Sequence, residues 1–187
     1  MSPFSPDGTA LVQPIPPNAQ TQIAAFRTTL AQAGATDELK SYDLVWLLHL
    51  VGDVHQLLHA TSRLMQDQTQ GDRGGNLVQL CAKPCKDELH AYWDNILGTG
   101  KSPTTATKAA ALLAAPDATL AAESNESQWI QESFGPAKQS VYIAPIGVGA
   151  GPFTTNSTYK TTGEMIANRQ IALGGVRLAN LLNAALQ

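Results

Sequence analysis

The segment from Asp37 to Ala60 constrains the fold most, because it is the most apolar part of the chain and its apolar residues recur at helical spacing. It opens with acidic residues, as the first turn of a helix often does. Its apolar stretch, residues 44–52, is interrupted by His49 and falls short of the ~20 residues that span a bilayer. We therefore expect a long core helix around which other helices pack, with no membrane span.

The rest of the chain alternates helical patterns with turns rich in Gly, Pro and polar residues. We predict a Pro-rich N-terminal arm over residues 1–19, a loop over 66–76 and a short extended piece over 76–81. Further helices are expected over residues 20–34, 86–97, 104–122 with a break at Pro116, 125–142 with an interruption at Gly135–Pro136, and 161–186. We see no convincing strand alternation. The expected fold class is all-α: a single-domain helical bundle over residues 1–187, with about five or six helices and a short Gly-rich loop or small hairpin.

Charge and short motifs exclude several function classes. Lys and Arg number 12 against 15 Asp and Glu, so a strongly basic nucleic-acid clamp is excluded and any nucleic-acid contact must use a local site. The first residues, MSPFSPDG, show no signal peptide. No serine-hydrolase elbow and no phosphate-binding P-loop motif is present.

Cys81 and Cys85 are the two cysteines of the chain, in the sequence CAKPC. A small disulfide-closed loop is the interpretation we favour, and it would indicate an oxidising compartment. The alternative is a reduced pair in the cytosol. A metal knuckle would need a second Cys or His pair nearby.

Two short patterns carry candidate metal ligands. His49 and Asp53 form one HxxxD pair, and His90 and Asp94 form another. Residues four apart lie on one face of a helix, so each pair places an imidazole and a carboxylate within reach of one cation, and these donors suit zinc. Each pair alone is also an ordinary helical ion pair. Two pairs in a chain with only 4 His favour a metal site.

His59 extends the set. It lies ten residues after His49, about 15 Å further along the same expected helix, and we therefore predict that it cannot share a metal with His49. It can join His90 and Asp94 instead.

Other polar and aromatic residues near these pairs are given supporting roles. We predict that His55 is a surface or supporting residue and not a ligand, and that Gln56 orients a ligand. Trp46 and Trp93 are expected in the core.

Several separated stretches together resemble one family. They read HLVGDVHQLLH over residues 49–59, DRGGN over 72–76, LHAYWDNIL over 89–97, WIQESFGPAKQSVY over 129–142 and QIALGGVRLANLLN over 170–183. In this order they closely resemble the single-strand-specific zinc nucleases of fungi and plants, which belong with the zinc-dependent phospholipases C. The resemblance covers nearly the whole chain.

The resemblance implies an α-helical, secreted or periplasmic phosphoesterase with a three-zinc cluster. It implies hydrolysis of single-stranded nucleic acid or nucleotide phosphate esters by zinc-activated water. The residues that it assigns to metal ligation are His49, Asp53, His59, His90 and Asp94. Asp53 would bridge two metals, and Asn76 would lie beside the scissile phosphate, which makes both candidate catalytic residues.

The chain departs from the family pattern in three respects. The family begins with a Trp that binds zinc through its amine and carbonyl and is followed by an early His, whereas this chain begins Met-Ser-Pro. An Asp and a His upstream of the first HxxxD pair are also expected, but no His precedes His49, so the chain looks like the family without its N-terminal third. Leu57 stands where the family has Pro, so we expect a straighter helix. We expect one or two zinc ions, with Asp7, Asp43 or Asp72 as candidate replacement ligands.

Other functions stay open. The chain could be a phospholipase C-like or other hydrolase, or a non-catalytic zinc-binding homologue. A homo-oligomer could bury an exposed apolar face or supply ligands from a second copy.

Overall fold

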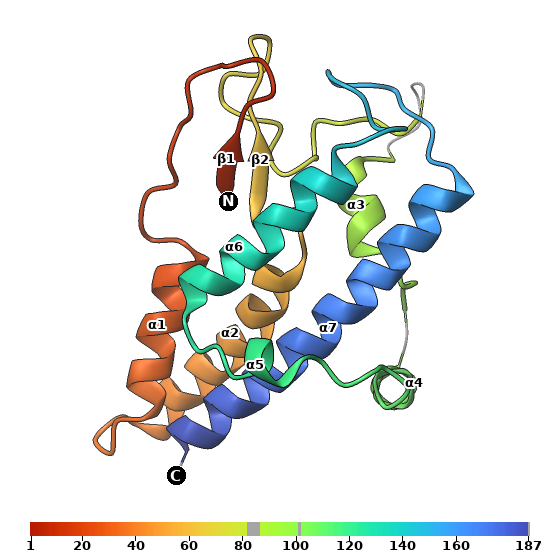
Figure 1. The fold of residues 1–187 in the computed structure, drawn as a ribbon. Helices are drawn as coiled ribbons and strands as arrows, with labels where there is room; N and C mark the ends of the chain where they lie inside the picture. Colours follow the sequence, from red (N-terminus) through yellow and green to blue (C-terminus); the bar gives the residue numbers. More distant parts are fainter. Residues whose placement is uncertain (82–86, 101, 187) are drawn as a thin grey trace.

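The structure, a computed structural model, describes residues 1–81, 87–100 and 102–186 (Figure 1). Its elements in chain order are β1 (Ser2–Phe4), α1 (Ala19–Leu30), α2 (Asp37–His55), β2 (Thr61–Arg63), α3 (Leu89–Asp94), α4 (Pro103–Ala110), α5 (Ala118–Ala121), α6 (Glu126–Pro136), a π-helical turn (Ala137–Val141) and α7 (Ser157–Ala185). The prediction of an all-α domain is confirmed. Among the described helices, none combines the length and the hydropathy that a membrane span requires.

Side-chain caps explain where the main helices begin. The Asn18 side chain accepts a hydrogen bond from the Thr21 backbone, and the Thr21 hydroxyl accepts one from the Asn18 backbone, which forms a capping box at α1. Thr36 caps α2, and Asn156 caps α7. These caps satisfy backbone N–H groups that have no partner inside the helix.

Helix α2 packs against both α1 and α7, and α6 crosses the same region (Figure 1). One core cluster joins these four helices and contains Ile23, Leu30, Leu47, Val51, Val54, Trp129, Leu181 and Ala185. A second cluster lies around α3 and contains Leu57, Leu58, Val78, Leu89, Trp93, Ala137, Val141, Ile146 and Tyr159. The chain between α2 and β2 connects the two clusters, so its path is fixed from both sides.

The described strands form one parallel pair. Ser2 lies opposite Thr61 and Phe4 opposite Arg63, so β1 anchors the start of the N-terminal arm to the segment that follows α2. The pair joins segments distant in sequence and is not a hairpin. Strand pairs this short and this distant leave no alternation signal in the sequence.

Helix α2 ends earlier than predicted and is exposed on one face. The helix was expected to continue to Ala60, but it ends at His55, and Gln56 has an extended backbone with φ −81° and ψ 125°. The expectation that Trp46 lies in the core is also wrong, because this side chain is 39% exposed. The buried stripe of α2 runs through Leu47 and Val51 instead, while Trp46 lies on the face that the described elements leave open. Trp93 is buried, as predicted.

Candidate metal centre

The early end of α2 brings His59 back beside the helix. After His55 the chain turns, and the His59 backbone N–H donates to the carbonyl of Gln56 at 3.1 Å. His59 Nδ1 then lies 3.5 Å from Asp53 Oδ2. On a continued helix, His59 would lie about 9 Å further along the axis than Asp53 and on another face. The prediction that His59 belongs to the same helix as His49 is therefore wrong.

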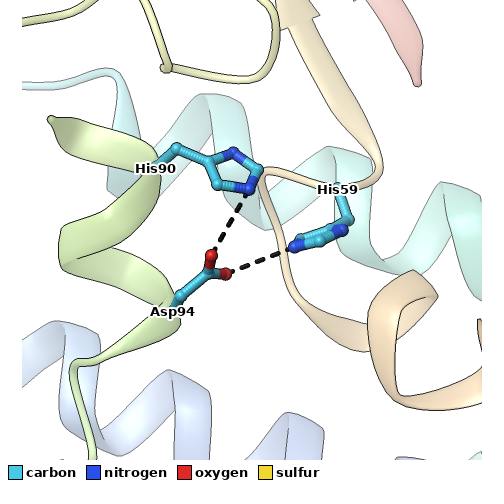
Figure 2. A group of neighbouring side chains, drawn as sticks. All are labelled: His59, His90 and Asp94. Carbon is cyan, nitrogen blue, oxygen red and sulfur yellow. Dashed lines mark hydrogen bonds and ion pairs between the residues drawn. The ribbon is translucent and has the colours of Figure 1, made fainter. Parts of the chain in front are cut away.

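Three side chains from two segments converge on one point (Figure 2). His59 Nε2 lies 3.2 Å from Asp94 Oδ1, and His90 Nε2 lies 3.5 Å from Asp94 Oδ2. One ligand atom from each of the three residues lies within 4.8 Å of the other two. The i, i+4 spacing on α3 places His90 and Asp94 on one face, and the turn after α2 supplies His59. The predicted convergence of His59, His90 and Asp94 is found, and we call these residues the metal cluster.

The metal cluster offers donor types that suit a zinc ion. His59 Nε2 lies 3.2 Å from Asp94 Oδ1 and His90 Nε2 lies 3.5 Å from the other carboxylate oxygen, Oδ2, so both imidazoles face the same carboxylate. Two imidazoles and a carboxylate are donors that zinc accepts, and three protein ligands leave a fourth position open. Among the described residues this is the group of His, Cys, Asp and Glu side chains whose ligand atoms meet within 4.8 Å.

Neighbouring groups fix the orientation of the cluster. His90 Nδ1 lies 2.7 Å from the carbonyl of Gly74, so this nitrogen carries the proton and Nε2 points into the cluster. Gln56 Nε2 donates to Asp94 Oδ1 at 2.7 Å, while Gln56 Oε1 accepts from the backbone of Leu58. The expectation that Gln56 orients a ligand agrees with these contacts.

Gly74 reaches His90 because it has no side chain. Its φ is +63°, in the left-handed region that favours glycine. A Cβ at Gly74 would lie 2.3 Å from the carbonyl oxygen of Leu58. The Gly-rich turn is therefore required to place a carbonyl against His90, a role that the sequence motif alone did not reveal.

The pair His49 and Asp53 lies next to the metal cluster. His49 Nε2 is 3.2 Å from Asp53 Oδ2, as the i, i+4 spacing predicts, and the His49 side chain is 62% exposed. Asp53 Oδ2 thus contacts both His49 and His59. Burial acts to raise the pKa of Asp53, but the hydrogen bond from His59 and the charges of His59, His49 and His90 outweigh it and lower the pKa. Asp53 is therefore a carboxylate at neutral pH.

His59 is influenced by two carboxylates. Burial acts to lower its pKa, but the hydrogen bonds and charges of Asp53 and Asp94 outweigh this effect and raise it above the usual value. The side chain is 28% exposed, so the site is accessible from solvent. A cation is attracted to the same two carboxylates.

His55 lies in a different environment from the one predicted. It was expected at the surface or in a supporting position, and the surface alternative is wrong because His55 is 3% exposed. Arg177 Nη1 donates to His55 Nε2 at 3.1 Å, and because arginine only donates, His55 Nδ1 carries the proton and donates to the Val51 carbonyl at 2.7 Å. Burial lowers the pKa of His55 to about 4, and the Arg177 charge adds to this while the Val51 hydrogen bond opposes it. His55 is not part of the metal cluster, as predicted.

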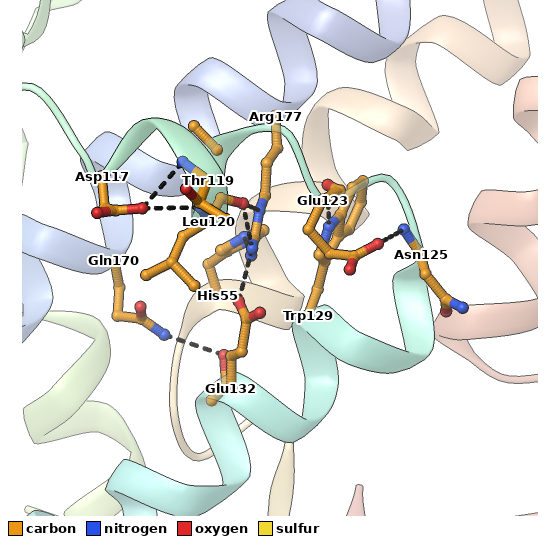
Figure 3. A network of polar contacts seen from close by, with 12 residues as sticks. His55, Asp117, Thr119, Leu120, Glu123, Asn125, Trp129, Glu132, Gln170 and Arg177 are labelled. Carbon is orange, nitrogen blue, oxygen red and sulfur yellow. Dashed lines mark hydrogen bonds and ion pairs between the residues drawn. The ribbon is translucent and has the colours of Figure 1, made fainter.

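Arg177 is the centre of a buried network that the sequence did not reveal (Figure 3). Its guanidinium donates to Glu132 at 2.6 Å and to the Leu120 carbonyl at 2.7 Å, and it lies over the ring of Trp129. The network joins α2, α5, α6 and α7 at the end of α2. An arginine within the apolar C-terminal helix was the signal that could have indicated it.

The remaining candidate ligands are used elsewhere. Asp7 accepts hydrogen bonds from Ser5, Thr9 and the Gln66 backbone. Asp43 is buried, which raises its pKa, and a hydrogen bond with Thr29 opposes that rise. Asp72 is buried beside Arg63. None of the three belongs to the metal cluster found among the described residues.

Two further predictions concern Asn76 and the cysteine pair. The amide of Asn76 donates to the Arg73 carbonyl at 2.7 Å, next to the glycine turn that contacts His90. Its catalytic role stays a prediction. The predicted disulfide involves Cys85, which lies outside the described residues.

A cavity of about 390 Å³ adjoins the metal cluster. Asp53, His59 and Asp94 line one part of it, and apolar side chains of α2, α3 and α7 line most of the rest. Its volume is within the range of small-molecule sites. A molecule in the cavity would lie beside the metal ligands.

Comparison with known proteins identifies the family. The S1/P1 nuclease family matches residues 13–187 of the chain. Endonuclease 4 of Arabidopsis thaliana is 31% identical over 153 residues, which cover 75% of this chain and 49% of the relative. The chain thus spans about half the length of this curated relative. On the extent of the family match, the chain belongs to the S1/P1 nuclease family.

Proposed function

We propose that this protein is a zinc-dependent phosphoesterase that hydrolyses single-stranded nucleic acid or nucleotide phosphate esters. The convergence of His59, His90 and Asp94, with one ligand atom from each within 4.8 Å of the other two, is the observation that carries the proposal. The family match supports the reaction class. We further propose a secreted or periplasmic location, on the family resemblance alone.

The metal cluster would hold the tighter zinc, and His49 with Asp53 would hold a second, weaker one. When bound, zinc supplies an activated water and neutralises charge that develops on the phosphate oxygens. Asp53 is a carboxylate at neutral pH, so it can accept a proton or a hydrogen bond from a water beside the cluster. Gly74 and Gln56 hold His90 and Asp94 in place, so these ligands need not reorganise when substrate binds.

Asn76 has a separate part in the proposal. One amide hydrogen is used by the Arg73 carbonyl, and the other remains for a phosphate oxygen. This would place a neutral donor beside the charged centre. The role predicts a loss of turnover in Asn76→Ala without a loss of zinc.

The first test is the zinc content per chain in protein purified without chelator or added metal. We expect one or two zinc ions, and hydrolysis of single-stranded DNA or a nucleotide monoester that is lost with a chelator. Asp94→Ala should lower zinc affinity about a hundredfold or more and abolish turnover, because it removes one of three ligands. Asp67→Ala, an exposed carboxylate in a loop, is the matched control.

A second variant separates the two metal positions. His49→Ala should leave the tighter zinc in place, because His49 lies outside the metal cluster. His55→Ala is unsuitable as a control since His55 is buried in the Arg177 network. A protein that binds no zinc, even when zinc is added, would contradict the proposal. Zinc binding without any turnover would indicate the non-catalytic alternative.

A further inference from the structure

The cavity beside the metal cluster is mainly apolar. Its apolar lining includes Leu48, Leu57, Ile96, Ile171 and Leu178. These residues come from α2, the turn after it, the chain after α3, and α7. A group bound there would be recognised mainly by apolar contact and shape.

Most polar groups of the lining residues that are not metal ligands already have partners. Both ring nitrogens of His55 are hydrogen-bonded, and both ends of the Gln56 amide are used by Asp94 and Leu58. The Gln170 amide nitrogen donates to the Ser133 hydroxyl at 3.1 Å. A ligand group with several donors and acceptors would therefore leave most of them unpaired here, at a cost in binding energy.

Two adjacent glycines of α7 line the cavity and differ in their surroundings. A Cβ at Gly174 would lie 3.1 Å from the His55 ring, so packing explains why this position is small. A Cβ at Gly175 would meet nothing within 4 Å. Glycine inside a helix is unfavourable relative to alanine, and no neighbour accounts for it at Gly175. The missing side chain at Gly175 leaves open space in the cavity.

We propose that this cavity binds the apolar organic group of a phosphate ester whose phosphate lies at the metal cluster. An aryl ring or an alkyl chain has the required chemistry. The inference rests on the proposed function for the position of the phosphate only. Under this proposal, the cavity selects an ester by its apolar group and not by the identity of a base.

The test measures binding of three phosphonates, which are not hydrolysed, to the zinc-loaded protein by calorimetry. We expect 1-naphthylphosphonate or octylphosphonate to bind about tenfold or more tightly than methylphosphonate, because each buries additional apolar area. The tighter of the two identifies a ring or a chain as the preferred group. Equal affinity of all three phosphonates would overturn the proposal.

Variants at Gly175 locate the effect. Gly175→Phe should fill the space and bring the affinity for the larger phosphonates close to the affinity for methylphosphonate, that is, an affinity ratio near one. It should not change zinc content or methylphosphonate affinity. Gly175→Ala is the matched control and should keep the ratio. Ala167→Phe, on the same cavity wall, is a second filling variant should Gly175→Phe fold poorly. A ratio unchanged by either filling variant would place the apolar group elsewhere and overturn the proposal.

A further probe separates this inference from the proposed function. Uncharged 1-naphthol, followed by fluorescence in zinc-free protein, should bind wild type and not Gly175→Phe. If it binds in this way but zinc does not bind, the cavity inference holds for the ring and the phosphoesterase proposal fails. If zinc binds and esters are hydrolysed, but 1-naphthol does not bind and neither larger phosphonate binds more tightly than methylphosphonate, the cavity inference alone fails.

Discussion

His55 and His59 are four residues apart, and their surroundings differ in almost every respect. His55 is the last residue of α2, buried, neutral and held by Arg177. His59 follows the turn, is partly exposed and lies between Asp53 and Asp94. Burial and a cation lower the pKa of the first, whereas two carboxylates raise the pKa of the second. The partners, and not the residue type, decide which histidine can attract a metal.

The two histidines also belong to two different regions: the buried Arg177 network, which stabilises the fold, and the metal cluster, which solvent and ligands can reach. The Arg177 network fixes the end of α2 from inside the protein, where four helices meet. The metal cluster lies on the other side of the same turn, where solvent and ligands have access. We therefore expect changes in the network to affect stability first, and changes around the cluster to affect zinc first.

Arg177→Met should have the largest effect of these variants, and the property that it changes should be the stability of the fold. It leaves Glu132 without its 2.6 Å partner and the Leu120 carbonyl without a donor, so we expect a loss of about 3–5 kcal/mol in the free energy of unfolding. Urea unfolding measures this loss. Arg169→Met, an exposed position on the same helix, should change little. If Arg177→Met lowered zinc affinity in still-folded protein, the separation between the two regions would be wrong.

The pH dependence of stability should distinguish the two histidines in zinc-free protein. The pKa of His55 is about 4 in the folded state against 6.5 unfolded, so its contribution is present above pH 6.5 and is lost as pH falls toward 4, by about 3 kcal/mol. His59 has the opposite sign, since its raised pKa favours the folded state at low pH and loses that effect as pH rises.

Urea unfolding between pH 7.5 and 4.5, with a chelator present, checks this prediction. His55→Gln keeps an acceptor for Arg177 and does not titrate, so its stability should fall less steeply with decreasing pH than that of wild type. Asp67→Asn, at an exposed position in a loop, should follow wild type. Equal slopes in wild type and His55→Gln would show that His55 does not stay neutral in the folded protein.

Local pattern was sufficient to predict the helical fold class and the two HxxxD pairs, but not the end of every helix. The i, i+4 rule placed His49 beside Asp53 and His90 beside Asp94, and both contacts are present at 3.2 and 3.5 Å. Caps such as Asn18 mark helix starts in the sequence itself. These features depend on neighbours a few residues away, and for that reason the sequence alone indicates them.

The end of α2 could not be predicted in the same way. No Gly or Pro stands at Gln56, and the helical pattern continues beyond it. The helix ends there because Leu57 and Leu58 are buried in the second core cluster and the Gln56 side chain bonds to Asp94, all of which are tertiary contacts. This one boundary decides whether His59 belongs to the cluster.

Gly74→Ala should weaken the cluster without removing a ligand. The added Cβ collides with the Leu58 carbonyl at a left-handed φ of +63°, so the turn must shift and the His90 ring loses its acceptor. We expect about 2 kcal/mol of destabilisation and a tenfold to hundredfold loss of zinc affinity, measured by zinc titration.

The matched control for Gly74→Ala is Gly100→Ala. Gly100 has a similar φ of +66° and nothing within 4 Å of an added Cβ, so this variant carries the backbone strain without the collision. It should lose some stability and keep the zinc affinity of wild type. Equal zinc loss in both variants would show that the Gly74 carbonyl does not orient His90.

Gln56→Ala should have the smallest effect and is the most specific test of the comparison. It removes the 2.7 Å hydrogen bond to Asp94 and the acceptor for the Leu58 N–H. Both contacts lie in the turn between the Arg177 network and the metal cluster. We expect about a tenfold loss of zinc affinity, since orienting partners of metal ligands contribute about this much, with a stability loss near 1 kcal/mol. Gln20→Ala, on the surface of α1, is the control. If stability falls while zinc affinity is unchanged, Gln56 shapes the turn only, and Asp94 needs no orienting partner.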